Sequence, residues 1–257
     1  MRIEGVFFLG AALYLIATLT MVFGTRIAGN QLSEMTGGFF SSLVTGLHVL
    51  RQERTLLGVM AVTVIFNVWG FPFFSMIPII GKEVLGLSPL PLGLLVSAEG
   101  LGALTGALLI VAFAKVQFYR KLYTYGVFLT LVMAFAFSQA SNFLSAALFL
   151  FLTGLGAGFF AAMQSTLVMF CTPLEARGRM MGLLTVFIGI STLGFLHIGI
   201  LAKWLGAESA IVVCTVEGFL MLLLVCRVWP EVLAPQLLPS DSSIKKLNVN
   251  HDGALSK

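Results

Sequence analysis

Charged side chains are scarce in this sequence of 257 residues: only 10% are Asp, Glu, Lys or Arg, whereas 58% are hydrophobic. A typical soluble domain carries roughly 25% charged residues, so these few charges could not cover a water-facing surface. The mean hydropathy of +1.02 supports the same interpretation. The composition therefore excludes an ordinary soluble domain and favours a polytopic membrane protein, in which each span uses about 20 residues.

Cysteines and catalytic motifs are also few. Cys171, Cys214 and Cys226 lie in or beside apolar segments, without a CxxC pair or a histidine cluster at zinc spacing. We therefore expect reduced, packed thiols, no metal site and no cofactor. The sequence lacks HExxH, GxSxG and Walker motifs, which argues against an enzyme. Its aromatic residues follow lipid-facing habits, which argues against nucleic acid as a partner.

Seven long segments are apolar, and acidic residues interrupt them only at Glu99 and Glu217. Backbone groups in hydrocarbon must satisfy their own hydrogen bonds, and the segments lack the alternating polarity of barrel strands. The sequence therefore predicts an all-α membrane protein with about seven transmembrane helices, the second of them kinked by Pro72 and Pro78. The segments are Val6 to Phe23, Leu56 to Ile80, Leu90 to Ala114, Leu122 to Ala140, Phe143 to Thr172, Met180 to Ala202, and Ala210 to Cys226.

The first segment could also be a cleaved signal peptide, but its apolar run is longer than a usual signal core, so we retain it as a helix. The expected organisation is a first helix at 1–24, a cytoplasmic linker at 25–55, a six-helix bundle at 56–229 and a disordered cytoplasmic tail at 230–257. Within the linker, Phe39 to Leu50 is apolar enough for a short interfacial helix.

Basic residues predict the orientation, because Lys and Arg accumulate in cytoplasmic loops. With the N-terminus outside, twelve of the fifteen basic residues fall on the cytoplasmic side, and only Arg2, Lys82 and Lys203 fall outside. We therefore expect a multi-pass protein of the cell membrane with its N-terminus outside and its C-terminus in the cytoplasm.

Glu99 is the first candidate functional residue, because ionisable groups are costly at membrane depth. It lies about 14 Å into its span, and Gly102, Ala103 and Gly106 share its helical face. A face of small residues packs against another helix, so the carboxyl group should point into the bundle. Glu99 is either a proton-binding or cation-binding group, or a neutral packing residue.

Four more polar residues lie inside the spans. Asn67 and Gln164 either line a solute path or hydrogen-bond neighbouring helices. Glu217 is a second candidate for proton coupling, although no stripe of small residues marks a tight interface around it. His197 lies near the outer end of its predicted helix, where an interfacial role is expected. A second stripe of small residues, which would let helices approach closely, consists of Gly154, Gly158, Ala161 and Ser165.

The loop after the fifth span carries the most specific pattern, P-L-E-A-R-G-R-M-M-G-L at residues 173–183. It resembles the P-x-E-x-R-G-R-x-x-G-L stretch between helices ten and eleven of major facilitator superfamily efflux transporters. The second and third spans are similar to helices seven and eight of the enterobactin-exporter and macrolide-efflux branch. That likeness rests on Phe66, Asn67, Gly70, Phe71, Pro72, Pro78, Val84, Leu85, Gly86 and Leu101 to Leu108.

The resemblance implies that the seven spans correspond to helices six to twelve of a twelve-helix transporter, whose two halves rock around a midplane site. It implies that Asn67, Glu99 and Gln164 face the solute cavity, where they would bind substrate. It also implies that Glu217 belongs to a peripheral helix.

The resemblance further implies a cytoplasmic gating loop. Arg177, Gly178 and Arg179, with Glu175 as acidic partner, match the family residues that brace the cytoplasmic helix ends. The loop at 115–121 should correspond to the family's G-x-x-x-D-R-x-G-R-R motif. It keeps the basic charge but lacks the Asp and the glycines, so gating by that motif is in doubt.

Together these features predict a proton-coupled secondary transporter of the efflux type, or its C-terminal half, that exports an amphipathic small molecule. The expected partners are the lipid bilayer, the solute, and a missing N-terminal half or a second copy. The alternative is a truncated, non-transporting membrane protein that acts as an assembly partner or is an inactive fragment. A seven-helix receptor is disfavoured, because no D-R-Y follows the third span and no N-P-x-x-Y occurs in the last.

Overall fold

The chain forms two units, residues 1–42 and 43–257. In the first unit, residues 11–12 and 14–21 are helical with exposed side chains. The rest of the predicted span Val6 to Phe23 lies outside the described residues. The computed structural model describes residues 11–12, 14–21 and 39–235.

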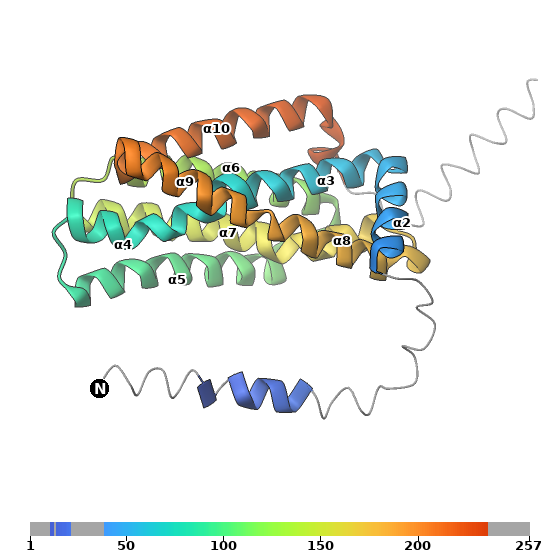
Figure 1. The fold of residues 1–257 in the computed structure, drawn as a ribbon, viewed down its shortest axis with the longest axis horizontal. Coiled ribbons are helices and arrows are strands. Elements are labelled where there is room, and N and C mark those ends of the chain that lie inside the picture. Colours follow the sequence, from blue (N-terminus) through green and yellow to red (C-terminus); the bar gives the residue numbers. More distant parts are fainter. Residues whose placement is uncertain (1–10, 13, 22–38, 236–257) are drawn as a thin grey trace, which may run out of the picture. The chain divides into compact units, whose positions relative to one another are not determined.

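Six helices among the described residues are long and apolar enough to cross a membrane. The part of the chain from residue 39 to 235 contains no strand, and the long helices lie side by side (Figure 1). The prediction of an all-α membrane protein is thereby confirmed. The six spans are Arg54–Val84, Pro89–Phe113, Val116–Ser138, Phe143–Cys171, Leu174–Leu205 and Ala207–Val228.

The first of these six spans is an irregular helix. Pro72 and Pro78 lack the N–H group that a regular helix needs, and the helix departs from α geometry around both, as the sequence predicts. A π-helical turn adds a residue to one turn and changes the direction of the side chains that follow. The span consists of α3 (Arg54–Ile65), the π-helical η1 (Phe66–Gly70), the 3-10 segment η2 (Phe71–Met76), α4 (Ile77–Ile79) and the π-helical η3 (Ile80–Val84).

The second and fourth spans, α5 (Pro89–Phe113) and α7 (Phe143–Cys171), pack backbone against backbone. A Cβ atom at Gly102 would overlap the carbonyl oxygen of Phe151, and one at Gly154 would overlap the carbonyl oxygen of Glu99. The two small-residue stripes seen in the sequence therefore face each other. Their contact fixes the backbone of Glu99 against α7.

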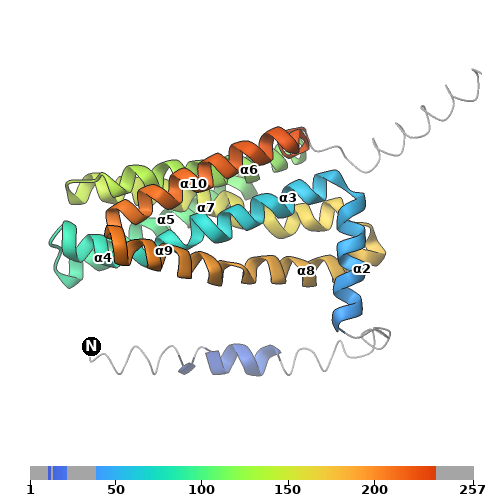
Figure 2. The ribbon, with the colours of Figure 1, turned by 45° about the horizontal axis from the view of Figure 1, so that its top comes forward.

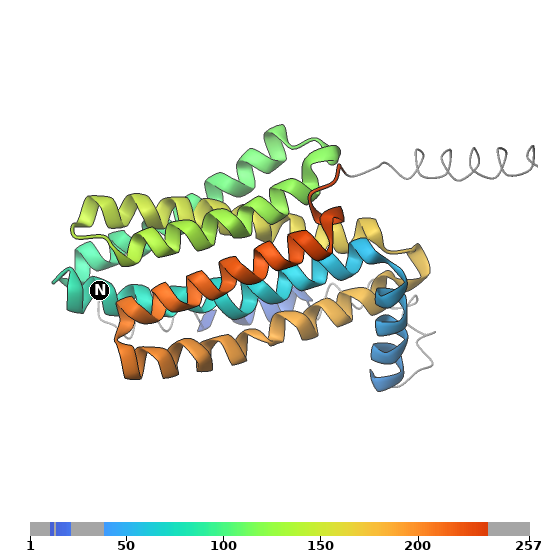
Figure 3. The same cartoon turned by 90° about the horizontal axis from the view of Figure 1, so that it is seen from above.

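The remaining spans, which include α10 (Ala207–Val228), complete the bundle. α8 (Arg177–Gly189) and α9 (Ser191–Leu205) run on from each other along one side (Figure 2). Seen from above, α10 lies between α9 and α6 (Tyr119–Ser138), with which it makes extensive contact (Figure 3). The short segments η4 (Val116–Phe118) and η5 (Leu174–Ala176) lead into α6 and α8.

A helix also forms in the predicted linker, as α2 (Phe39–Gln52). Its position agrees with the short helix expected from Phe39 to Leu50. Gly46 of α2 lies in van der Waals reach of the Arg179 carbonyl oxygen and of Leu183. This contact places the part of α2 around Gly46 beside the start of α8.

The start of the predicted tail lies within the described residues. Residues 230–235 are described, and they start with the 3-10 turn η6 (Pro230–Val232). Val232 is 1% exposed, and it packs so closely on Gly58 that a Cβ there would lie 2.5 Å from it. The segment also accepts a hydrogen bond from Thr124 Oγ1 at the Val232 carbonyl oxygen, and it carries the ion pair described below. The rest of the predicted tail lies outside the described residues.

Candidate functional site

An open cavity of about 750 Å³ lies between the first span, α5, α7 and α8. Its lining includes Asn67, Glu99 and Gln164, the three residues that the resemblance assigns to solute binding. Asn67 lies 13 residues after Arg54, Glu99 lies 10 residues after Pro89, and Gln164 lies seven residues before Cys171. At 1.5 Å per residue these positions are about 20, 15 and 10 Å from their helix ends, so the cavity lies deep in the bundle.

The two amide side chains of the cavity differ in their hydrogen bonds. Asn67 donates from Nδ2 to the carbonyl oxygen of Thr63 at 2.9 Å. Gln164 is 9% exposed, and its Nε2 has no hydrogen-bond partner among the described residues. An unsatisfied buried donor costs about 1–3 kcal/mol. A solute with an acceptor in the cavity would remove that cost.

Two aromatic residues that line the cavity, Phe66 and Phe160, belong to a stack that continues to the buried Tyr123. The ring of Phe160 stacks on Phe66 at 3.9 Å between centroids and on Tyr123 at 5.0 Å. The Tyr123 hydroxyl is held by Thr63 Oγ1 at 2.6 Å and donates to the Val59 carbonyl oxygen at 3.1 Å. The sequence indicated that aromatics would contact solute but could not say which, because three separate helices supply the stack.

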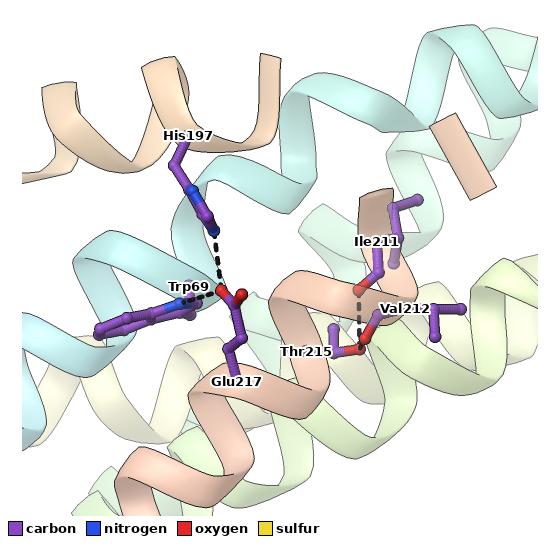
Figure 4. A network of polar contacts seen from close by, with 6 residues as sticks. All are labelled: Trp69, His197, Ile211, Val212, Thr215 and Glu217. Atoms are coloured by element: carbon purple, nitrogen blue, oxygen red, sulfur yellow. Dashed lines mark hydrogen bonds and ion pairs between the residues drawn. The ribbon is translucent and has the colours of Figure 1, made fainter. Parts of the chain in front are cut away.

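A second polar cluster joins three spans on another side of the bundle (Figure 4). Glu217 Oε2 accepts a hydrogen bond from the Trp69 indole Nε1 at 2.9 Å and lies 2.7 Å from His197 Nε2. Glu217 is not among the residues that line the cavity. Sequence reasoning missed this pairing, because nothing in the chain order connects the three residues.

His197 lies farther from the outer end of its helix than the sequence suggested, because the helix ends later than predicted. The span continues to Leu205, eight residues beyond His197 and about 12 Å away. Glu217 lies ten residues after Ala207, so the two side chains meet at similar depth on either side of the turn at Gly206. His197 thus has a protein partner within the span.

The sequence shows no stripe of small residues around Glu217, yet its helix packs tightly against a neighbouring helix. A Cβ at Gly218 would lie 2.7 Å from the Trp69 Cβ, and one at Gly194 would overlap the Val68 carbonyl oxygen. Single glycines therefore bring α9 and α10 close to η1. The signal was present in the sequence, but one glycine per helix does not form a periodic pattern.

The predicted gating loop lies at η5 and the start of α8. Arg177 donates from Nε to the Thr172 carbonyl oxygen at 3.4 Å, and the space beside Gly178 is open. Glu175 is exposed and forms no ion pair with Arg177 or Arg179 in the part of the chain that is described. A bracing role for these four residues stays a prediction.

A different group of contacts holds the same end of the bundle together. Arg54 at the start of α3 pairs with Glu231 Oε1 at 3.1 Å and donates to the Val228 carbonyl oxygen at 3.2 Å. Arg120 at the start of α6 donates to the Glu231 carbonyl oxygen at 3.1 Å. Sequence reasoning placed both arginines on the positive side of the membrane, and Arg120 also in the loop at 115–121, but it did not predict these contacts.

The Arg54 to Gln substitution (R54Q) should weaken this end of the bundle slightly. The Arg54 side chain is 67% exposed, and exposed ion pairs contribute up to about 1 kcal/mol. We expect the thermal unfolding midpoint in detergent, followed by circular dichroism, to fall by about 1–3 °C. R51Q changes an exposed arginine of α2 and should leave the midpoint unchanged. Equal shifts in both variants would contradict the role given to Arg54.

Comparison with known families adds one match. The model of the family described as Major Facilitator Superfamily matches residues 64–247. The matched region contains Asn67, Glu99 and Gln164 as well as the cluster of Trp69, His197 and Glu217. A comparison with curated proteins found no match.

Proposed function

This chain belongs to the major facilitator superfamily, a family of secondary transporters, and we propose that it is a proton-coupled exporter of an amphipathic small molecule, or the C-terminal half of one. The observation that carries the proposal is the convergence of Asn67, Glu99 and Gln164 on one cavity deep in the bundle. The more specific likeness to the enterobactin-exporter and macrolide-efflux branch belongs to this proposal.

The lining of the cavity supports an amphipathic solute. Four phenylalanines and five alanines give it apolar walls, and two amides and one carboxyl group supply polar contacts. Small-molecule sites have this composition, with volumes of about 300–1,000 Å³. The unpartnered Gln164 amide favours a solute that brings a hydrogen-bond acceptor.

Glu99 supports the coupling to protons. Among the residues lining the cavity, it alone has an ionisable side chain. A carboxyl group can release its proton when solute binds and take one up when solute leaves. One carboxyl group can therefore serve both proton binding and solute binding. Intramembrane carboxyl groups that face a cavity are the usual elements of such relays.

The remaining features of the proposed transporter are the second wall of its cavity, its orientation in the membrane and its gate. The cavity is not enclosed by this chain, and a family member closes its site by rocking two halves against each other. An N-terminal half or a second copy of this chain would supply the other wall. We propose the N-terminus outside and the C-terminus inside, with residues 175–179 at the cytoplasmic gate.

Filling the cavity should prevent solute binding. Ala161 lines the cavity, and A161F would place a ring in the space that the solute occupies. We expect the binding of a fluorescent amphipathic dye to the purified chain in detergent to weaken by about tenfold or more, which corresponds to about 1.4 kcal/mol. Dye polarisation measures the affinity.

The control is A112F, which adds the same ring at an exposed position of α5 outside the cavity. It should bind dye as the unmodified chain does. If both variants bind dye equally well, the cavity is not the solute site. If the unmodified chain binds no dye, the alternative of a non-transporting assembly partner gains support.

A further inference from the structure

The cluster of Trp69, His197 and Glu217 has a fourth member, Cys214. His197, Cys214 and Glu217 each offer one ligand atom, and these atoms all lie within 4.8 Å of one another. Cys214 and Glu217 are three residues apart on α10, so they share one helical face. Figure 4 shows His197 projecting from α9 towards Glu217. Two neighbouring helices thus direct an imidazole, a thiol and a carboxyl group at one point.

Imidazole, thiolate and carboxylate together are the ligand set of zinc. Zinc binds nitrogen and oxygen at about 2.0–2.2 Å and sulfur at about 2.3 Å, which places tetrahedral ligands about 3.5 Å apart. His197 Nε2 and Glu217 Oε2 are 2.7 Å apart and would separate slightly to admit an ion. The three ligand atoms already lie close enough for side-chain rotations to complete the geometry.

We propose that His197, Cys214 and Glu217 form a binding site for a divalent zinc-class ion between α9 and α10, with a fourth coordination position open. This site is separate from the cavity of the proposed function and does not depend on it.

Charge balance favours an ion at this depth. A zinc ion deprotonates a coordinating thiol, so one thiolate, one carboxylate and one neutral imidazole cancel its charge of +2. A neutral complex avoids the cost of leaving a charged group in the membrane. Among the described residues, the partners of the Glu217 carboxyl group are Trp69 and His197.

Trp69 supports the site from outside the ligand shell. Its indole N–H donates to Glu217 Oε2 at 2.9 Å and so fixes the orientation of the carboxyl group. Partners that orient a ligand in this way commonly contribute 10–100-fold to metal affinity. The side chains of His197 and Glu217 are 37% and 40% exposed, whereas Cys214 is buried.

The sequence predicted no metal site because it holds no histidine cluster at zinc spacing. The ligands here come from two helices whose residues 197 and 214 are joined through a turn at Gly206. Only the pairing of α9 with α10 brings them together, so a local motif could not reveal them.

Titration of the purified full chain with Co²⁺ in detergent under reducing conditions tests the site. Cobalt replaces zinc in such sites, and its bond to a thiolate gives a charge-transfer band in the near ultraviolet. We expect a band that saturates at one Co²⁺ per chain and disappears when Zn²⁺ is added. C214S should lose the band, whereas H197Q and E217Q should weaken Co²⁺ binding by about tenfold or more.

The matched control is C226S, which removes a second cysteine of α10, away from the cluster, and should keep the band. The thermal midpoint of the unmodified chain should rise when Zn²⁺ is added and should not rise for C214S, which separates binding from misfolding. The proposal is overturned if the unmodified chain shows no cobalt-thiolate band, if C214S retains it, or if C226S removes it.

Discussion

Replacing Glu99 with glutamine is expected to abolish proton-driven efflux. Glutamine has nearly the size of a protonated glutamate but cannot release a proton, and Glu99 is the ionisable residue of the cavity lining. When dye-loaded proteoliposomes that contain the complete transporter are given an acidic exterior, E99Q should release dye no faster than protein-free liposomes. The dye affinity of the purified chain should change little, because the shape of the cavity is kept.

Two controls distinguish coupling from damage. E99D keeps a carboxyl group and should retain part of the proton-driven efflux. E208Q removes an exposed carboxyl group at the start of α10, outside the cavity, and should behave as the unmodified transporter does. If E99Q responds to the pH gradient as fully as the unmodified transporter, Glu99 has no part in coupling.

Replacing Gly102 with valine is expected to separate α5 from α7. Even a Cβ at Gly102 would overlap the Phe151 carbonyl oxygen, and backbone cannot move aside as a side-chain end can. Overpacking of this kind costs about 3 kcal/mol, so the unfolding midpoint in detergent should fall by about 10 °C. Circular dichroism at the helical minimum measures it. Dye binding should weaken too, since both helices line the cavity.

The same substitution at Gly100, two residues earlier on α5, provides the control. Nothing lies within 4 Å of a Cβ at Gly100, so G100V adds its side chain in open space. Valine is also a slightly better helix former than glycine. We therefore expect no loss of stability from G100V. A similar loss in both variants would contradict the role given to the α5–α7 contact.

Much of the fold could be predicted because membrane spans are a local property of the sequence. Runs of about 20 apolar residues mark spanning helices whatever surrounds them, and the six spans found in the described residues match six of the predicted segments. Boundaries were less predictable. The span predicted from Met180 to Ala202 extends from Leu174 to Leu205, because polar residues near a helix end interrupt the apolar run without interrupting the helix.

The candidate site could be predicted in part. Asn67, Glu99 and Gln164 stand out because polar groups at depth are rare, and the structure brings all three to one cavity. The aromatic stack could not be predicted, since phenylalanines occur throughout the spans and only packing selects Phe66 and Phe160.

The sequence by itself determined that this protein is a bundle of membrane helices with a few polar groups at depth. The reason is that the apolar character and the length of each segment mark it as a spanning helix, whatever its neighbours are. Only the tertiary structure decided which of those groups meet. Asn67 and Trp69 are two residues apart in the π-helical turn η1, yet Asn67 lines the cavity and Trp69 bonds Glu217 of α10. Helix pairing and the direction of each side chain determine such contacts, and both depend on residues far apart in the chain.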